Sequence, residues 1–314
     1  MKQPLIILTG PTAVGKTKAS IDLAREIGGE IISADSVQVY KGMDIGSAKI
    51  TPIEMMNITH HMVDILAPNG DFHVEKFQNM AKEAMADIYS RGNIPIIVGG
   101  TGFYIQALLY DIDFSEAKED SVYRKELMQL ADKKGVMYLH NQLRSVDSQS
   151  ADVIHPNNIK RVIRALEYFK ETNTPISQHN AIERQKKSPY NFAYFVLNDN
   201  RIKLYERINT RVDLMMAEGL LEEVKSLQQQ GYTRDLVSMQ GIGYKEIHAY
   251  LANECSLDDA IEQIKLNTRH FAKRQLTWFK REGEVIWINK DELGYDDKEI
   301  NRYLLKQLKE RAII

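Results

Sequence analysis

The sequence predicts an α/β protein in which a parallel sheet is flanked by helices and interrupted by an all-helical insertion domain. Short apolar strands alternate with helical segments, a pattern typical of a parallel sheet covered on both faces. Between about residues 111 and 190 the apolar residues have helical spacing, and no convincing strand is found. We therefore expect a core domain formed by residues 1–111 and 199–314, and a helical insertion domain at residues 112–198.

The individual elements follow from the spacing and type of the apolar residues. Short β-branched apolar runs predict buried strands, and apolar residues three and four positions apart predict helices. The candidate strands are the opening PLIILTG run and the segments 30–36, 94–100, 192–197 and 284–289. Helical spacing is found at 16–28, 74–92, 123–135 and 157–171, and over most of 201–281, where QGIGY (240–244) interrupts it.

Composition limits the class of protein. The chain has 314 residues, 43% hydrophobic and 27% charged, which is the balance of a globular protein large enough to be an enzyme. Its net charge of −2 gives polyanions no overall attraction, so any nucleic-acid binding must be local. The single Cys255 cannot form an internal disulfide, and the opening apolar run is too short for a secretory or membrane segment. We expect a cytoplasmic monomer without a membrane partner.

A G-x-x-x-x-G-K-[ST] motif lies between the first predicted strand and the first predicted helix. Its glycines let backbone N–H groups close around phosphate oxygens at a helix N-terminus, where the helix dipole favours an anion. A glycine turn that only links strand to helix would not require Lys16 and Thr17 after Gly15. The motif predicts a P-loop NTPase-like core that binds a di- or triphosphate, with the Thr17 hydroxyl on Mg²⁺. The phosphate-binding residues are Gly10, Pro11, Thr12, Ala13, Val14, Gly15, Lys16 and Thr17.

Two polar residues follow predicted strands and become candidate catalytic residues. Ligands of parallel sheets bind beyond the carboxyl ends of the strands, where Asp35 and Thr101 lie in the sequence. Asp35 is therefore a candidate general base beside a bound phosphate ester. The alternatives are that Asp35 caps the next segment and that Thr101, among glycines, forms a plain turn. A metal pair at His60 and His61 is disfavoured, because adjacent side chains diverge on a helix or a strand.

The segment 265–281 contains six Lys or Arg residues and no acid. On a helix, Lys265, Arg269, Lys273 and Lys280 fall within an arc of about 80°. Like charges on one arc repel each other unless an anion is nearby, so the pattern favours a polyanionic partner over a merely solvated face. Weaker cationic pairs are Arg161 with Arg164, and Arg207 with Arg211, the second of which we expect near the phosphate loop.

Eight segments together resemble the tRNA dimethylallyltransferases, also called tRNA isopentenyltransferases, over nearly the whole chain. The phosphate loop alone is shared by many families, whereas the ordered set of segments is highly specific. The segments are GPTAVGKT (10–17), DSVQVYKGMDIGSAK (35–49), HHMVDI (60–65), VGGTGFY (98–104), KRVIRALE (160–167), INTRVDLMMAEGLLEEV (208–224), QGIGYKE (240–246) and AKRQLTWFKRE (272–282).

The resemblance implies an activity and a set of residue roles. Enzymes of this family transfer the dimethylallyl group from dimethylallyl diphosphate to N6 of adenosine 37, beside the anticodon, in tRNAs that read codons beginning with U. Asp35 would accept the proton of that amine, Thr101 would help to hold the reaction centre, and Arg211 would join the phosphate loop in gripping the diphosphate and Mg²⁺. The anticodon stem-loop would be contacted by Asp35, Ser36, Val37, Gln38, Thr101, Arg124, Ile159, Lys160, Arg161, Val162 and Ile163, to which the charge pattern adds Arg164, Lys273 and Lys280.

Two other classes of function share some of these features. A nucleotide or nucleoside kinase would have the phosphate loop, Mg²⁺ and a helical lid, and would turn over ATP with a small acceptor. A non-catalytic RNA-binding switch would use the loop to report its nucleotide state. Such a switch would retain tRNA affinity when Asp35 is replaced and would form no product.

Overall fold

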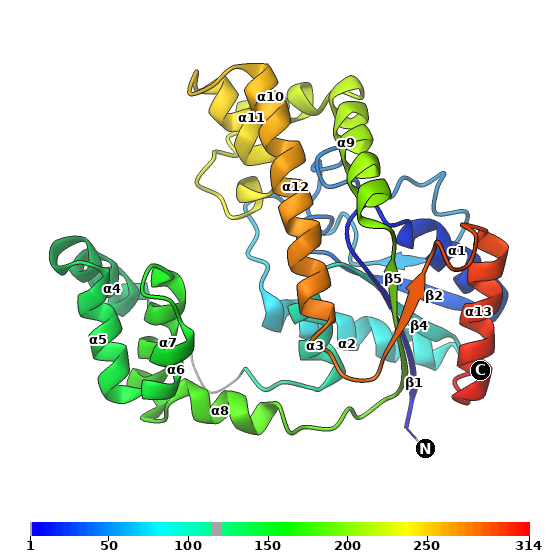
Figure 1. Ribbon diagram of the computed structural model, residues 1–314, viewed down its shortest axis with the longest axis horizontal. Coiled ribbons are helices and arrows are strands. Elements are labelled where there is room, and N and C mark those ends of the chain that lie inside the picture. The colour runs from blue at the N-terminus through cyan, green and yellow to red at the C-terminus, as the bar shows by residue number, and fades with distance from the viewer. Residues whose placement is uncertain (1, 115–120) are drawn as a thin grey trace. The chain divides into compact units, whose positions relative to one another are not determined.

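The computed structural model describes residues 2–114 and 121–314 (Figure 1). The chain forms two compact units, one of Met1–Leu108 with Pro189–Ile314 and the other of Leu109–Ser188. The second boundary lies earlier than the expected 198 because β5 (Asn191–Asn198) pairs with β1 (Pro4–Thr9) and so belongs to the sheet. No helix among the described residues is long and apolar enough to cross a membrane.

The first unit contains a six-stranded, all-parallel sheet of order β3-β2-β4-β1-β5-β6. The five expected strands are present, and the sixth is the two-residue edge strand β3 (His60–His61), too short to leave a periodic pattern in the sequence. Every residue of β2 is buried, as a central parallel strand requires. The remaining strands are β2 (Gly29–Ala34), β4 (Ile94–Gly99) and β6 (Val285–Asn289).

Helices cover the sheet and extend one end of this unit. α1 and α13 pack against each other at one flank, and α12 packs along α9 and α11 (Figure 1). One apolar cluster joins the sheet to α1 and α13, and a second joins the loop after β2 to the helices from α9 to α12. The helices are α1 (Lys16–Ile27), α2 (Val74–Ser90), α3 (Gly102–Leu109), α9 (Arg201–Ala217), α10 (Leu220–Gln229), η1 (Ser238–Gln240), α11 (Tyr244–Leu251), α12 (Leu257–Phe279) and α13 (Asp297–Glu310).

The described residues of the second unit form helices and connecting loops without a strand, as the sequence predicts. Its core is a single apolar cluster that includes Leu139, Leu143, Val162 and Leu166. The apolar stripe of α7 supplies much of this cluster, while the cations Lys160 and Arg161 of the same helix are exposed. The helices are α4 (Ser121–Lys134), α5 (Val136–Val146), α6 (Ser148–Val153), α7 (Ile159–Thr172) and α8 (Ile176–Glu183).

Candidate active site

The strand register brings three chain segments to one edge of the sheet. Thr9 of β1 and Ala34 of β2 are both in register with Gly99 of β4. The Thr9 hydroxyl donates to the Gly99 carbonyl at 2.6 Å, and the Thr101 amide donates to the Ala34 carbonyl at 3.3 Å. The phosphate loop, Asp35 and Thr101 therefore begin at adjacent strand ends, in the place where parallel sheets bind ligands.

The phosphate loop has the conformation of an anion-binding nest. Gly10 has a φ of +147°, and a Cβ there would lie 2.4 Å from the Leu197 carbonyl oxygen, so only glycine fits. Left-handed residues recur at Ala13 and Gly15, the second of which is the N-cap of α1. Lys16 Nζ donates to the Gly10 and Pro11 carbonyls at 3.0 and 2.9 Å. The loop thus combines curved backbone, a helix N-terminus and an ammonium group.

The electrostatics of Lys16 tie it to two other predicted site residues. Its pKa is lowered to about 8, first by burial of the ammonium and second by the charge of Arg211, while the Asp35 carboxylate acts in the opposite direction. Burial also lowers the pKa of Arg211. An added anion would relieve the repulsion between these two cations, which makes this region a favourable place for a diphosphate.

Two further cations bind carbonyl groups of the phosphate loop. Arg207 Nε donates to the Ala13 carbonyl at 3.1 Å, and its Nη2 pairs with the fully buried Asp199. Lys290, just beyond β6, donates to the Val14 carbonyl at 3.3 Å. The predicted approach of Arg207 to the loop is thus observed. Side chains distant in the sequence therefore bind the carbonyls of the loop and hold its backbone in place.

Asp35 combines a structural contact with an unused oxygen. Its Oδ1 accepts from the Val37 amide at 2.8 Å and from the Gln38 amide at 3.3 Å, so the capping role considered from the sequence is real. Its Oδ2 accepts no hydrogen bond from any residue that the structure describes. The turn fixes the carboxylate, and the second oxygen remains able to take a proton.

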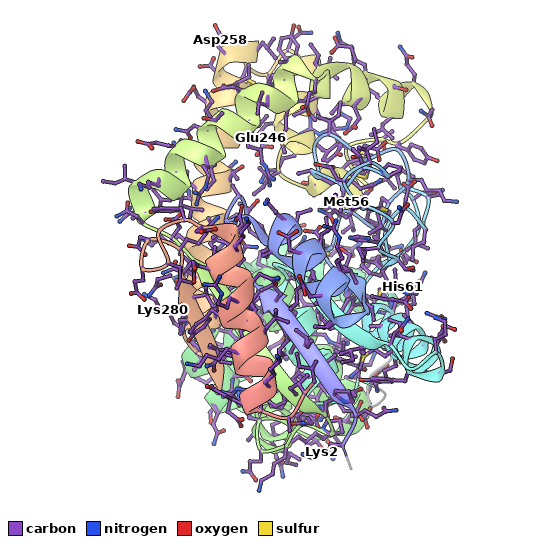
Figure 2. All side chains as sticks on the ribbon, turned by 90° about the vertical axis from the view of Figure 1, so that its right-hand side faces the viewer. Lys2, Met56, His61, Glu246, Asp258 and Lys280 are labelled. Carbon is purple, nitrogen blue, oxygen red and sulfur yellow. The ribbon has the colours of Figure 1, made fainter. Side chains whose placement is uncertain are left out.

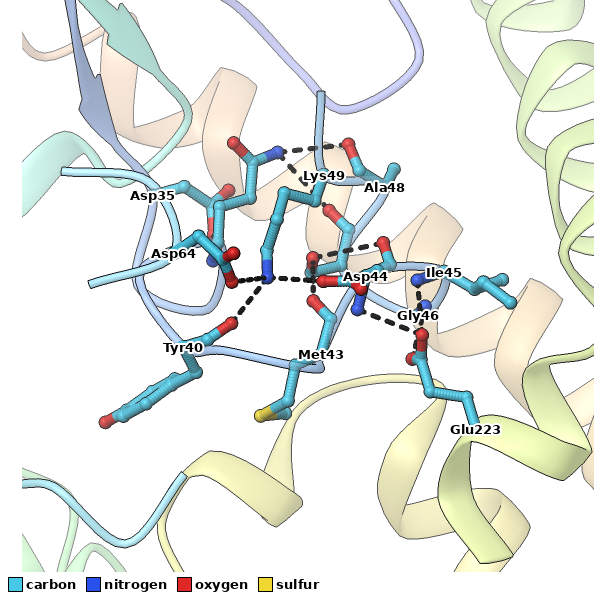
Figure 3. A network of polar contacts seen from close by, with 12 residues as sticks. Asp35, Tyr40, Met43, Asp44, Ile45, Gly46, Ala48, Lys49, Asp64 and Glu223 are labelled. Carbon is cyan, nitrogen blue, oxygen red and sulfur yellow. Dashed lines mark hydrogen bonds and ion pairs between the residues drawn. The ribbon is translucent and has the colours of Figure 1, made fainter. Parts of the chain in front are cut away.

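The loop after Asp35 is held by a polar network (Figure 3). Glu223 accepts from the amides of Asp44, Ile45 and Gly46 at 3.0, 2.7 and 3.1 Å, and from the Tyr244 hydroxyl at 2.7 Å. Burial, reinforced by the Glu223 charge, raises the pKa of Tyr244. A carboxylate from α10 therefore organises the loop that leads back to Asp35.

Lys49 closes the same network from the other side (Figure 3). Its Nζ donates to the Tyr40 carbonyl at 2.5 Å and pairs with Asp44 at 2.5 Å and Asp64 at 2.8 Å. Asp64 is thus engaged with a lysine. His61 Nε2 lies 2.8 Å from Glu30 Oε2. Among the described residues, no group of three or more acidic, His or Cys side chains could hold a metal ion.

Thr101 begins α3. Its carbonyl accepts from the Tyr104 amide at 3.0 Å, so the turn expected at this position is formed. Its hydroxyl has no hydrogen-bond partner within 2–114 and 121–314, and the residue is half-buried beside the end of β2. Gly102 cannot carry a side chain, since a Cβ would lie 2.2 Å from the Trp278 ring of α12.

The cationic arc of α12 differs from the expected one. Lys265 pairs with Asp213 at 2.8 Å and Glu262 at 3.0 Å, and Arg269 donates to Asn209 at 2.6 Å, so these charges are already satisfied within the chain. Figure 2 shows Lys280 at the far end of α12 from Asp258, and the helix ends just before it. An open hollow of about 420 Å³ is instead lined by His270, Lys273, Arg274, Thr277, Trp278 and Arg281.

In the helical unit, several predicted tRNA-contacting residues are occupied by internal contacts. Arg124 forms a bidentate pair with the fully buried Glu167 at 2.9 and 2.8 Å. Val162 and Ile163 belong to the apolar core of this unit. Lys160 and Arg161 are exposed at the start of α7, whereas Ile159 and Arg164 of the same helix are only partly exposed. The exposed cations are therefore the members of this set that are available to a polyanion.

Comparison with known proteins agrees with this geometry. A family model described as IPP transferase matches residues 38–282. The chain belongs to this family. A tRNA dimethylallyltransferase of Lachnoclostridium phytofermentans is 60% identical over 312 residues, covering 99% of both chains. The resemblance inferred from the ordered motifs is thus confirmed.

Solved structures of the IPP transferase family share the fold. A tRNA isopentenylpyrophosphate transferase from Bacillus halodurans matches with 43% identity and a TM-score of 0.74, covering 99% of this chain and 98% of that one. A eukaryotic dimethylallyltransferase, described as acting on tRNA, matches with 29% identity and a TM-score of 0.84, covering 96% of this chain and 78% of that one.

Three residues of this IPP transferase site were not predicted from the sequence. Lys290 follows a strand, so the strand-end argument that selected Asp35 could also have selected it. Gln275 lies at a core position of α12, between Ala272 and Phe279, where a polar residue is a detectable anomaly. Glu223 lies on an amphipathic helix among other acids, and no local pattern distinguishes it.

Proposed function

We propose that this protein transfers the dimethylallyl group from dimethylallyl diphosphate to N6 of adenosine 37 in tRNAs that read codons beginning with U, releasing diphosphate. The observation that carries the proposal is the shared strand-end edge, where the phosphate loop of Lys16 and the carboxylate of Asp35 are close enough for their charges to interact. The family and the tRNA-directed relatives support the same activity.

The donor side of the reaction needs a stabilised leaving group. As the bond between the allylic carbon and the diphosphate oxygen breaks, its electron pair remains on the diphosphate. The loop amides, Lys16 and Arg211 would stabilise this growing charge more strongly than they stabilise the bound donor, which is the requirement for catalysis. Arg207 and Lys290 donate to the Ala13 and Val14 carbonyls and would hold the backbone of the loop in place during this step.

The acceptor side needs a stronger nucleophile. The lone pair of an exocyclic adenine amine is delocalised into the ring, so a carboxylate that accepts its hydrogen raises the electron density on nitrogen. The nitrogen forms the new bond to the allylic carbon and its proton passes to Asp35 Oδ2, while Oδ1 keeps its contact with the Val37 amide. The Thr101 hydroxyl, at the neighbouring strand end, would help to hold the reaction centre.

Mg²⁺ fits this site as a cofactor shared between protein and substrate. Mg²⁺ commonly binds through one or two protein oxygens together with substrate phosphates and water. Thr17, exposed in the first turn of α1, offers one such oxygen in its hydroxyl. Among the described residues, no group of acidic, His or Cys side chains could hold the ion without the substrate. When bound, the ion would neutralise part of the diphosphate charge.

The RNA side of the proposal uses exposed and partly exposed residues from both units. Asp35, Ser36, Val37, Gln38 and Thr101 would surround the target adenosine, which must leave its stack to be modified. Lys160 and Arg161 on α7, with Lys273 in the hollow of α12 and Lys280 beyond it, would contact RNA phosphates. We propose that a single copy of the chain acts on the anticodon stem-loop in the cytoplasm.

The direct test is incubation with unmodified tRNA and labelled dimethylallyl diphosphate, followed by nucleoside analysis. The proposal expects label on the N6-modified adenosine next to the anticodon and equimolar release of diphosphate. The control is ATP with small nucleoside acceptors. Phosphorylated acceptors would instead identify a kinase, and tRNA binding with no modified nucleoside would identify an RNA-binding switch.

A further inference from the structure

One buried side chain of α12 contacts two separate segments of the active site. Gln275 is only 6% exposed. Its Oε1 accepts from the Thr12 amide of the phosphate loop at 2.9 Å, and its Nε2 donates to the Gly100 carbonyl at 3.0 Å. The amide therefore bridges the end of β1 and the end of β4.

The backbone around this bridge is adapted to it. A Cβ on Gly100 would lie 2.0 Å from Gln275 Nε2, so the close approach requires glycine at this position. One turn later on α12, the Trp278 ring occupies the space beside Gly102. Two of the glycines around Thr101 are thus explained by contact with α12 rather than by a need for turn flexibility.

The Gly100 side of the bridge continues toward Asp35. Thr101 follows Gly100 directly and donates its amide to the Ala34 carbonyl, the residue before Asp35. A Cβ on Gly99 would lie 2.2 Å from that same carbonyl oxygen, which shows how closely the two strand ends meet. Displacement of Gly100 would therefore move Thr101 and disturb the support of Asp35.

We infer that Gln275 is a positioning residue that sets the separation between the phosphate loop and the Thr101–Asp35 side of the site. The inference rests on the proposed transfer reaction, because that reaction needs the diphosphate and the acceptor amine in one alignment. A misplacement of about 1 Å is enough to slow an aligned displacement about 100-fold. Both hydrogen bonds of Gln275 are made to backbone atoms, so its effect on the reaction passes through the backbone.

The chemical requirement at this position is specific. The bridge needs one acceptor for the Thr12 amide and one donor for the Gly100 carbonyl, which a carboxamide supplies in a single side chain. An ionised glutamate keeps the shape and the acceptor but sets a negative oxygen against the Gly100 carbonyl oxygen. A protonated glutamate restores the donor. Gln275→Glu therefore converts the bridge into one that depends on pH.

The test measures single-turnover transfer by Gln275→Glu and the unaltered protein between pH 6 and pH 8.5. At pH 8.5 we expect the variant to be at least about tenfold slower, with its KM for tRNA unchanged. The ratio of the variant rate to the unaltered rate should rise as pH falls and the introduced carboxyl gains a proton. Lys16 and Asp35, the titratable groups at the adjoining strand ends, are present in both proteins and their effects largely cancel in the ratio.

Two further variants complete the experiment. Gln263→Glu makes the same substitution at an exposed position of α12 and should match the unaltered rate at every pH. Gln275→Met keeps the length and lacks both hydrogen bonds, so its rate should be low at every pH. If Gln275→Glu does not fold, Gln275→Met tests the positioning role by itself, because a normal rate in that variant overturns the inference.

The outcomes separate this inference from the proposed function. Product from the unaltered protein together with a pH-independent rate ratio for Gln275→Glu would overturn the positioning role and leave the transfer activity standing. Absence of modified adenosine from the unaltered protein would instead overturn the transfer activity itself.

Discussion

The strand-end edge of the sheet and the exposed hollow of α12 differ in how firmly their polar groups are held. At the edge, the Ala13 and Val14 carbonyls and the Thr12 amide are bound by side chains distant in the sequence, which are Arg207, Lys290 and Gln275. In the hollow, Lys273 and Arg274 are exposed cations on one helix. Alignment of reacting atoms requires the first arrangement, whereas attraction of a phosphate backbone requires only charge. Substitutions at the edge should therefore change rates, and those in the hollow should change salt-dependent affinity.

The largest effect is expected at Asp35. Asp35→Asn keeps an oxygen for the Val37 amide, so the turn remains, but it removes the negative charge and the proton acceptor. We expect single-turnover transfer to fall by about 10²–10⁴-fold, the usual contribution of a general base. The affinity for tRNA, measured by filter binding, should stay within a few-fold. Near-normal transfer in this variant would remove Asp35 from the reaction.

Lys16 should give the next largest effect, and one that depends on pH. Its pKa of about 8 leaves the ammonium mostly neutral at pH 9 in the free protein, while a bound diphosphate favours the charged form. Binding of the donor should therefore weaken as pH rises through 8 and take up a proton above that pH. Calorimetry in buffers of different ionisation enthalpy measures the uptake.

Two variants of Lys16 separate its contribution to donor binding from the pH dependence of that binding. Lys16→Ala should weaken binding of dimethylallyl diphosphate, and Lys16→Arg should lose the pH dependence because its charge does not titrate in this range. Donor affinity that is unchanged in Lys16→Ala would mean that the loop serves a different phosphate.

The sequence predicted those features of the edge that are local. The apolar strands, the motif of the phosphate loop and the polar residues after the strands all depend on neighbouring residues, and the strand order then brings Lys16, Asp35 and Thr101 together. Gln275 and Glu223 act through contacts with segments far away in the chain, which no local pattern specifies. Of the arc predicted on α12, Lys265, Arg269 and Lys273 lie on the helix, whereas Lys280 lies just beyond its end. The acids that pair with Lys265 come partly from α9 and could not be placed without the fold.

Glu282, which follows α12, should make the free energy of unfolding depend on pH. Burial raises its pKa to about 7, so the native state binds more protons than the unfolded chain between about pH 4.5 and 7. Its contribution is therefore unfavourable above pH 7 and disappears at low pH. Glu282→Gln can still contact Gln106, which donates to Glu282 at 3.3 Å.

The expected gain from Glu282→Gln is about 1–2 kcal/mol in the free energy of unfolding at pH 8, after allowance for partial exposure. At pH 5 the gain should be close to zero. Urea unfolding at both pH values measures it, and an equal gain at pH 5 and pH 8 would show that the carboxyl does not titrate as described.

The smallest effect is expected in the hollow. Lys273→Gln should reduce the slope of log tRNA affinity against log salt by about 0.7–0.9, the value for one phosphate contact. Lys265→Gln is the matched control, because Lys265 is already paired with Asp213 and Glu262 and should leave the slope unchanged. Equal slopes for Lys273→Gln and the unaltered protein would show that Lys273 is a solvated surface residue without a phosphate contact. The same comparison applies to Lys280.

The most direct measurement is a crystal structure of the protein with an anticodon stem-loop and an unreactive thio analogue of dimethylallyl diphosphate. We expect the diphosphate against the amides of the phosphate loop, the Lys16 ammonium beside it, and N6 of the flipped adenine within hydrogen-bond distance of Asp35 Oδ2. A diphosphate bound elsewhere, or an adenine amine distant from Asp35 while the analogue occupies the loop, would contradict this expectation.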